Sequence, residues 1–598
     1  MIKTLLKSVR EYKLPSILCP VFMAGEAVME ILIPWRMAKI IEQLQIAAKD
    51  HIQLTTENFN IVLINAVLMI VFSLAALAFG VLGAKLGAKA SCGFAKNLRQ
   101  DIYDNLQNYS FANIDKYSTA SIITRITTDV TNVQQAYQMC IRMLVRAPVL
   151  FISAIVMTCL LEPQMAGIFV GAACVLGVIV AICMIKVTPH FRTMFKKYDK
   201  LNSVVQEDLT AIRVVKSYVR EDTEIEKMQQ ATGDVYKYAV KAEKILNYLM
   251  PCVNLILFTS NVIILTLGSM MYLNMGLHGN VEPSDIQMLI NYSVQILNGV
   301  LMVAMCLNFI SLSKGSMERI CEMLNEKTTI PQPENPVYEV ANGDIDFENV
   351  SFVYSNKSDK TVLSDINLHI NAGETVGIIG ATGSGKTSLV SLIPRLYEPS
   401  QGVVKVGGVD VKDYDLDTLR SKVAMVLQKN VLFSGTVAEN LRWGDENATE
   451  EQLRFAARQA CAEEFIDALP GGFEYDLGQG GVNVSGGQKQ RLCIARALLK
   501  KPDVIIFDDS TSAVDTKTDA QIRHSLKKYS PQTTKIIIAQ RVASVEDADK
   551  IIVLDEGKIA GVGTHEQLIK TNDIYREVYE SQKKGSDENE EKGVCDNE

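Results

Sequence analysis

The sequence has few histidines and places its cysteines without a metal-ligand pattern. Its 598 residues include 6 His and 12 Cys, and no two cysteines form a Cys-x-x-Cys pair or a Cys/His cluster. These absences argue against a zinc module or a disulfide framework. Several cysteines lie in apolar stretches, where a thiol acts as a small apolar side chain in a reducing compartment; they are Cys159, Cys174, Cys183 and Cys306.

Charged residues are missing from three long stretches. Residues 164–185, 245–281 and 286–313 contain no Asp, Glu, Lys or Arg. A transmembrane helix needs roughly 20 apolar residues, so each stretch is long enough to span a membrane. With three less extreme stretches, the sequence predicts six spans, at about residues 15–43, 60–84, 143–161, 165–185, 246–272 and 286–312.

Lysine and arginine are also missing from two of the predicted loops, around Glu162 and over residues 273–285. They are abundant in the N-terminal segment and in the long loops after spans two and four. This asymmetry predicts cytoplasmic termini and cytoplasmic long loops. The spans should continue into water as helices. Short connectors within residues 111–130 and 204–221 should join these helices, and short helices are expected at the two tips.

No leader with a cleavage site is evident at the N-terminus. Residues 1–16, "MIKTLLKSVREYKLPS", instead predict an interfacial amphipathic helix with Leu5, Leu6 and Val9 on one side. The net charge of −8 gives no sign of nucleic-acid binding. We expect a transmembrane domain at 1–324, a proline-containing linker at 325–342, an α/β domain at 343–582 and a disordered acidic tail at 583–598.

Two acids, Glu26 and Glu30, lie inside the first predicted span. They are four residues apart and therefore share a helix face. Acids inside a membrane are costly and suggest function. One interpretation is a substrate cavity or a proton site; the other is that the acids face water or pair with a neighbouring helix.

A phosphate-binding loop follows the apolar strand Val376–Ile379. The segment "GATGSGKT" fits G-x-x-x-x-G-K-[ST] between a strand and a helix. Its backbone N–H groups and the helix N-terminus can hold phosphates, while Lys386 neutralises them and Thr387 ligates Mg²⁺. Asp508, at the end of the later strand "VIIFD", is the matching carboxylate for the metal. The predicted ATP contacts in this loop are Gly380, Thr382, Gly383, Ser384, Gly385, Lys386, Thr387 and Ser388.

The segment "NVSGGQKQRLCIARAL" (483–498) resembles the signature motif of ATP-binding cassette (ABC) proteins. Other markers of that family follow the same order along the chain. The resemblance implies that Tyr354 stacks on adenine, that Gln428 senses Mg²⁺ and the membrane domain, and that Asp515 belongs to the D-loop. It also implies that "IIIAQR" (536–541) is the switch loop and that the signature residues Ser485, Gly486, Gly487 and Gln488 bind the ATP held by a second chain.

Two positions that serve hydrolysis differ from the family pattern. Asp509 stands where the family usually has the glutamate that activates water, and a carboxylate misplaced by about 1 Å can lose roughly 10²-fold in rate. Gln540 replaces the switch histidine, and an amide cannot carry a proton or a positive charge. The pattern predicts a site that binds ATP and cleaves it poorly; the alternative is that Asp509 works well enough. Gln479 and Gly480 also replace a Glu-Arg pair that is common in the family.

The resemblance covers nearly the whole chain and implies an ABC exporter half-transporter, with six helical spans fused to an α/β P-loop NTPase domain. We expect the degenerate subunit of a bacterial heterodimer in the cytoplasmic membrane, using ATP and Mg²⁺ to export amphipathic compounds. The partner should be a similar chain that keeps the Glu and the His. Export of a peptide or a lipid, or a role as an ATP-binding sensor subunit, are the alternatives.

Overall fold

The computed structural model describes residues 1–49, 56–273, 281–354, 361–509 and 516–583. They form two compact units, one of Met1–Gln107 with Ser118–Glu326 and one of Asn108–Tyr117 with Lys327–Glu598. The predicted D-loop residue Asp515 and the acidic tail from residue 584 onward lie outside the described residues.

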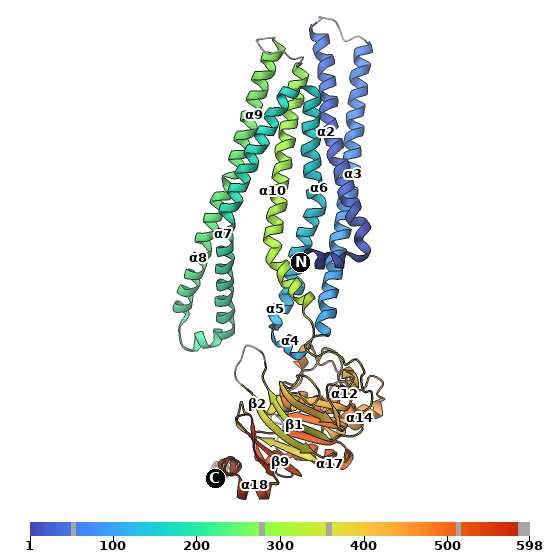
Figure 1. The fold of residues 1–598 in the computed structure, drawn as a ribbon, viewed down its shortest axis with the longest axis vertical. Helices are drawn as coiled ribbons and strands as arrows, with labels where there is room; N and C mark the ends of the chain where they lie inside the picture. Colours follow the sequence, from blue (N-terminus) through green and yellow to red (C-terminus); the bar gives the residue numbers. More distant parts are fainter. Residues whose placement is uncertain (50–55, 274–280, 355–360, 510–515, 584–598) are drawn as a thin grey trace. The chain divides into compact units, whose positions relative to one another are not determined.

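Within the described residues, six helical segments of the first unit are long and apolar enough to cross a membrane, which confirms the predicted architecture. They run side by side in the upper part of Figure 1. The helices that carry them are α2 (Lys13–Lys49), α3 (Thr56–Gln107), α6 (Val130–Leu161), α7 (Pro163–Ser217), α8 (Glu221–Asn247) continued by α9 (Leu249–Tyr272), and α10 (Pro283–Asn325).

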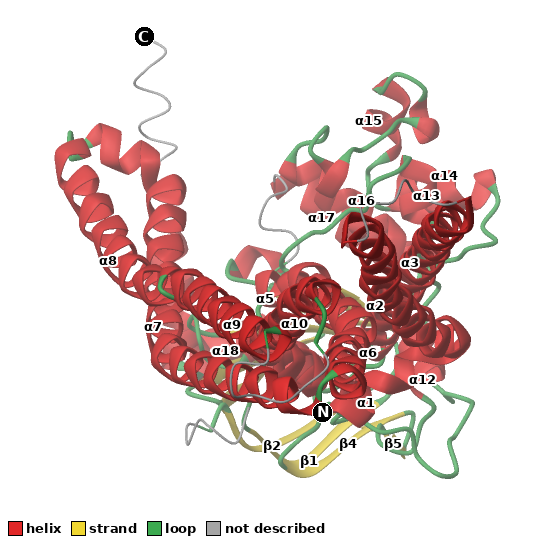
Figure 2. Cartoon of the chain, turned by 90° about the horizontal axis from the view of Figure 1, so that it is seen from above, coloured by secondary structure: helices red, strands yellow, loops and turns green. Residues whose placement is uncertain are grey.

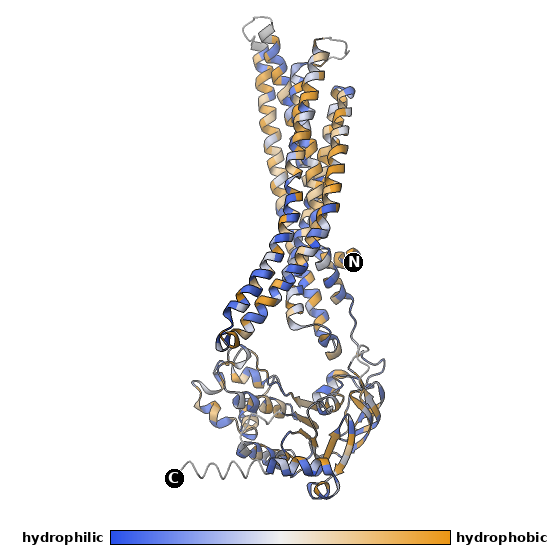
Figure 3. Cartoon of the chain, turned by 90° about the vertical axis from the view of Figure 1, so that its left-hand side faces the viewer, coloured by the Kyte–Doolittle hydropathy of each residue, from blue (hydrophilic) through white to orange (hydrophobic). Residues whose placement is uncertain are grey.

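Several of these helices are longer than a membrane is thick. Helix α3 has 52 residues and α7 has 55, so each is roughly 80 Å long against a hydrocarbon core of about 30 Å. Figure 3 shows apolar residues concentrated along one half of these helices and hydrophilic residues along the other. The long polar loops of the sequence are therefore largely helical extensions of the spans.

The two connectors between the extended helices differ. The first contains α4 (Phe111–Asp115), α5 (Thr119–Thr124) and the short π-helix η2 (Arg125–Asp129). The second is a turn at residues 218–220, because α7 and α8 both continue as helices up to it. The short helix considered for this second tip is therefore not found among the described residues. Val219 in the turn has a left-handed backbone, with φ of 53°.

The N-terminal segment packs against the helix bundle through α1 (Ile2–Leu6) and the 3-10 helix η1 (Lys7–Tyr12). Leu5 and Val9 are buried, but Leu6 is 50% exposed. The Ser8 hydroxyl donates a hydrogen bond of 2.5 Å to Asp101 on α3. The segment is thus an α-helix followed by a 3-10 helix, and its placement at the membrane interface stays a prediction.

The second unit contains two sheets. An antiparallel sheet has the order β2-β1-β4-β5, and a mixed sheet has the order β10-β9-β3-β8-β7-β6, in which only β10 is antiparallel to its neighbour. The strands are β1 (Ile345–Phe352), β2 (Leu363–Ile370), β3 (Thr375–Ile379), β4 (Gln401–Val406), β5 (Val409–Asp410), β6 (Val423–Val426), β7 (Val504–Asp508), β8 (Thr534–Ile538), β9 (Lys550–Asp555) and β10 (Lys558–Gly563).

Helices of the second unit, α13 to α17, group together on the side away from strands β1, β2, β4 and β5 (Figure 2). Strand β7 is buried along its whole length, which explains its apolar run without alternation. Since β3, β7 and β8 are parallel neighbours, their carboxyl ends meet at one edge of the sheet. The helices are α11 (Lys386–Ser391), α12 (Leu416–Lys422), α13 (Val437–Leu441), α14 (Glu450–Gln459), α15 (Glu463–Ala468), α16 (Gly486–Leu499), α17 (Thr516–Tyr529) and α18 (His565–Thr571), with short 3-10 turns η3 (Gly472–Glu474), η4 (Gln479–Gly481) and η5 (Val542–Ser544).

Candidate functional site

The phosphate-binding loop joins β3 to α11 with backbone angles that favour glycine. Gly383 and Gly385 have φ of 85° and 97°. A Cβ atom at Gly380 would lie 2.1 Å from the carbonyl oxygen of Leu554, so no side chain fits there. The loop therefore keeps its backbone exposed for phosphate oxygens, as the motif predicts.

The side chains expected to bind phosphate and metal converge at this loop. The Thr387 hydroxyl donates to an Asp508 carboxylate oxygen at 2.9 Å. The Lys386 ammonium donates to the carbonyl oxygens of Gly380 and Ala381, both at 2.8 Å. Thr387 and Asp508 offer hard oxygen atoms next to the loop, which is the donor type that Mg²⁺ prefers.

Burial changes the titration of both charged groups. It raises the pKa of the Asp508 carboxyl above its usual range, with a smaller opposing effect from the Thr387 hydrogen bond. It lowers the pKa of the Lys386 ammonium. Both groups are therefore less easily charged without nucleotide than they would be beside Mg²⁺ and phosphates.

The carboxylate of Asp509 is held by two glutamine amides. Gln540 Nε2 donates to Asp509 Oδ2 at 2.7 Å, and Gln428 Nε2 donates to the same oxygen at 3.3 Å. Asp509 also has a left-handed backbone, with φ of 46°. The two positions that depart from the family pattern thus meet in one hydrogen-bonded group, and Gln428 joins them.

Tyr354 lies at the edge of an aromatic cluster. Its hydroxyl is 2.8 Å from Ser388 Oγ, and its ring meets Tyr397 edge-on at 5.2 Å. Tyr397 in turn donates a hydrogen bond of 2.5 Å to Asp115 on α4, and packs edge-on against Phe111 of the same helix. The sequence analysis missed Tyr397 and Asp115, because their contact joins positions 282 residues apart and follows no motif.

The signature segment begins helix α16. Ser485 caps this helix: its hydroxyl accepts a hydrogen bond from the Gln488 N–H, and Gln488 Oε1 accepts one from the Ser485 N–H. Ser485 and Gly486 are exposed. The helix N-terminus therefore faces outward, where its N–H groups can hold an anion from another molecule. Gln479 and Gly480 lie just before it, exposed in η4.

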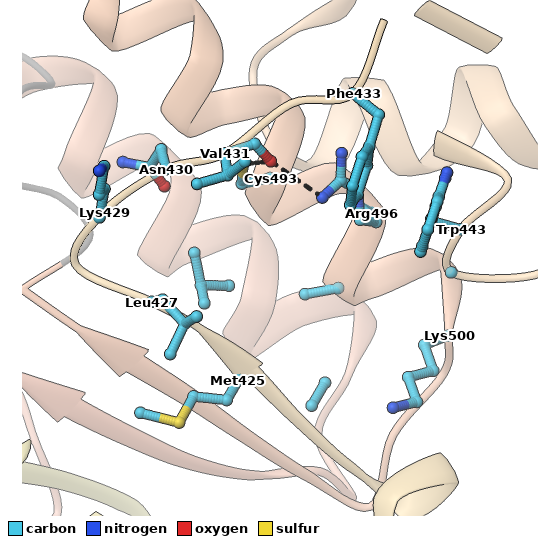
Figure 4. Close-up of a pocket in the computed structure, with 14 residues that line it drawn as sticks. Met425, Leu427, Lys429, Asn430, Val431, Phe433, Trp443, Cys493, Arg496 and Lys500 are labelled. Atoms are coloured by element: carbon cyan, nitrogen blue, oxygen red, sulfur yellow. Dashed lines mark hydrogen bonds between the residues drawn. The ribbon is translucent and has the colours of Figure 1, made fainter. Parts of the chain in front are cut away.

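A groove lies between β6 and α16 (Figure 4). Its volume is about 320 Å³. Phe433 and Trp443 stack at its rim with ring centroids 4.1 Å apart, and the Arg496 guanidinium lies near the Phe433 ring. It begins next to Gln428 and is lined by Ala424, Met425, Val426, Leu427, Lys429, Asn430, Val431, Phe433, Trp443, Gly444, Cys493, Arg496, Ala497 and Lys500.

Glu26 and Glu30 of α2 share one cation. Arg146 of α6 donates to Glu30 Oε1 at 2.7 Å and lies 3.4 Å from Glu26 Oε1. The other oxygen of Glu26 is buried and has no hydrogen-bond partner among the described residues. One positive and two negative charges thus meet inside the helix bundle. A sequence signal for Arg146 existed, because it is a charge inside the third predicted span.

An apolar cavity of about 600 Å³ lies between α6, α7 and α10 of the first unit. Small residues such as Gly177, Gly299 and Ala304 line it. Cavities of this size suit small organic molecules. No motif marks these positions, so the sequence analysis did not find the cavity.

Comparisons with known proteins agree with this architecture. Residues 16–300 match the model described as the ABC transporter transmembrane region, and residues 363–512 match the model described as ABC transporter. The chain is 32% identical over 577 residues to the uncharacterized ABC transporter ATP-binding protein YfiB of Bacillus subtilis, covering 96% of this chain and 98% of YfiB. It is 35% identical over 410 residues to the probable multidrug resistance ABC transporter ATP-binding/permease protein YheI of the same organism, covering 68% and 69%.

A solved structure shares the fold. The structure of a bacterial Atm1-family ABC exporter with ATP bound superposes with a TM-score of 0.81 at 22% identity, covering 96% of this chain and 98% of that one. Six membrane-spanning helices fused to a P-loop domain with a signature helix define an ATP-dependent, multi-pass membrane transporter. The chain belongs to the ABC transporter family.

Proposed function

We propose that this chain is the degenerate-site half of a heterodimeric ABC exporter. The observation that carries the proposal is the Asp509 carboxylate, which accepts hydrogen bonds from Gln540 and Gln428. These amides orient a carboxylate that is already one methylene shorter than the family's glutamate, and the partner at position 540 is an amide that cannot carry a proton. The binding residues Lys386, Thr387 and Asp508 keep an arrangement suited to Mg²⁺ and ATP.

A second chain is needed to complete each nucleotide site. The exposed Ser485 and the N-terminus of α16 support binding of the γ-phosphate of ATP held by the partner. The partner in this proposal is a similar half-transporter with Glu and His at the positions of Asp509 and Gln540. Its site, completed by this chain's signature, would be the faster one.

Two surfaces support the association. The turn between α7 and α8 exposes Tyr218 and Val219 by 74% and 80%. Such apolar exposure in a soluble loop is typical of an interaction site. The groove beside Gln428 offers the aromatic pair Phe433 and Trp443 as a receptor. We assign the partner's equivalent turn to this groove.

The proposed substrates are amphipathic compounds, drugs or lipophiles, moved out of the cytoplasm. The apolar cavity of about 600 Å³ supports this class, as does the multidrug description of YheI. The two acidic side chains of Glu26 and Glu30 outnumber the single cation of Arg146 by one, and this excess favours cationic substrates. The distribution of Lys and Arg supports a bacterial cytoplasmic membrane with both termini and the nucleotide domain in the cytoplasm.

The test compares two lesions in the assembled transporter, co-purified with its native partner. Ser485→Arg should remove most ATPase activity, because it damages the faster site. Lys386→Ala should reduce activity less, because it damages the slower one. Phosphate release measures both variants, and the chain purified alone should turn over poorly. The opposite ranking, or robust turnover by a verified homodimer, contradicts the proposal.

A further inference from the structure

The side-chain amide of Gln582 forms hydrogen bonds with two backbone groups of residues 539–545. We call these residues the switch-loop segment, because they overlap the end of the predicted switch loop and continue beyond it. Gln582 Oε1 accepts a hydrogen bond from the Val542 N–H at 2.8 Å. Gln582 Nε2 donates to the Gln540 carbonyl oxygen at 2.8 Å. The amide therefore pairs with the backbone through one donor and one acceptor, as a neighbouring strand would.

The helix that carries Gln582, residues 573–583, is anchored in the core. Tyr575 is fully buried, and its hydroxyl lies 2.7 Å from His565 Nδ1. Val578 and Tyr579 pack against the core cluster that also contains Val542 and Val545. The position of Gln582 is thus fixed by the same core that supports the switch-loop segment.

Gln540 links this contact to the nucleotide site. Its backbone carbonyl accepts a hydrogen bond from Gln582, and its side-chain amide donates one to Asp509 at 2.7 Å. A general base must present a carboxylate oxygen within hydrogen-bond distance of the attacking water. The Gln540 amide orients the Asp509 carboxylate and competes with water for its Oδ2 atom.

We propose that Gln582 is a positioning residue that holds the switch-loop segment where Gln540 occupies Asp509. The C-terminal helix then helps this chain to keep its ATP uncleaved. This consequence rests on the proposed slow site, but the contact itself does not. No motif for nucleotide binding includes Gln582, and it lies 73 positions after Asp509 in the chain.

Hydrogen–deuterium exchange of the full-length chain tests the contact. Gln582→Met keeps the length of the side chain and removes both hydrogen bonds, so amides of residues 539–545 should exchange about tenfold faster. Gln582→Glu keeps the acceptor for the Val542 N–H and loses the donor to Gln540, so protection of Val542 should remain. Glu580→Met, exposed on the same helix, is the matched control and should change nothing. Unchanged exchange in Gln582→Met overturns the proposal.

Residual ATP hydrolysis by the same preparations tests the consequence. Gln582→Met should raise kcat severalfold with little change in KM, and the gain should disappear in the Asp509→Asn background. A gain that survives Asp509→Asn, or a change confined to thermal stability, overturns the positioning role. Rapid hydrolysis by the unaltered chain would instead contradict the proposed slow site, while the exchange result would still decide the contact.

Discussion

Asp508 and Asp509 are adjacent and chemically identical, yet their surroundings differ. Asp508 is the last residue of β7. It is buried, and it accepts a hydrogen bond from the Thr387 hydroxyl. Asp509 directly follows the strand, has a positive φ itself, and accepts hydrogen bonds from two amides. At the scale of the residue, one acid is suited to hold a metal, while the other accepts the amide hydrogen bonds on which the proposed slow site rests.

Restoring both family residues should raise hydrolysis at this chain's own site. Asp509→Glu lengthens the carboxylate by one methylene, and Gln540→His removes the amide that occupies it. We expect at least a tenfold gain in phosphate release by the double variant in the assembled transporter. Asp509→Glu alone should gain less, because Gln540 still donates to the acid. Equal activity of the double variant and the parent contradicts this.

Mg²⁺-dependent ATP binding should weaken as pH falls. The pKa of Asp508 is raised by burial, and only its ionised form attracts the metal. Affinity should therefore be constant above that raised pKa and decline as pH drops through it. Titration with a fluorescent ATP analogue between about pH 5 and pH 7.5 measures the effect. The Asp508→Asn variant should bind ATP weakly, and its affinity should no longer depend on pH in this way. If the variant keeps the pH dependence of the parent, a group other than Asp508 takes up the proton.

At the scale of the element, helix α4 is tied to the aromatic cluster around Tyr354. The helix has only five residues, too few to be stable alone. Its capping box at Ser110 and Asn113, together with Asp115 and Phe111, holds it in the second unit. Burial, and then the hydrogen bond to Asp115, raise the pKa of Tyr397, so the phenol stays a donor at neutral pH.

Tyr397→Phe should loosen α4 and keep the aromatic packing. The lost hydrogen bond contributes about 1 kcal/mol, so amides of residues 111–117 should exchange roughly fivefold faster. ATP binding by the same variant, measured in parallel with the exchange, should change little, because Tyr354 is retained. Tyr103→Phe, an exposed tyrosine on α3, is the control. An equal effect of both substitutions contradicts a specific role for Tyr397.

At the scale of the whole molecule, the transmembrane unit carries one negative charge in excess at Glu26, Glu30 and Arg146. Three charges inside a helix bundle are costly without a purpose. The arrangement pairs Arg146 mainly with Glu30 and leaves Glu26 with the longer contact. The proposed cationic substrate would supply the second positive charge that these two acids lack.

Glu26→Gln with Glu30→Gln should shift export away from cations. In inverted vesicles containing the assembled transporter, we expect transport of a cationic dye to fall about tenfold relative to a neutral dye of similar size, which corresponds to about 1.4 kcal/mol. Arg36→Gln is a control outside the cluster, since Arg36 lies over Trp35. If the ratio of the two transport rates does not change, Glu26 and Glu30 serve only as ion-pair partners of Arg146.

Local patterns along the chain identify the class of this protein. Three charge-free stretches and three less extreme apolar stretches predicted six spans, because a helix that crosses a membrane must be mainly apolar. The phosphate loop, the buried strand before Asp508 and the signature are local patterns, since each binds through consecutive residues. These features were predictable from short segments of chain.

The contacts between side chains that are distant in the chain follow from the packing of the folded protein. Arg146 reaches Glu30 across 116 positions, Tyr397 reaches Asp115 across 282, and Gln582 reaches Gln540 across 42. Such pairs have no spacing rule, because the packing of separate helices and strands brings them together. The departures at Asp509 and Gln540 were visible in the sequence, but their hydrogen bond depends on β7 and β8 being neighbours in one parallel sheet.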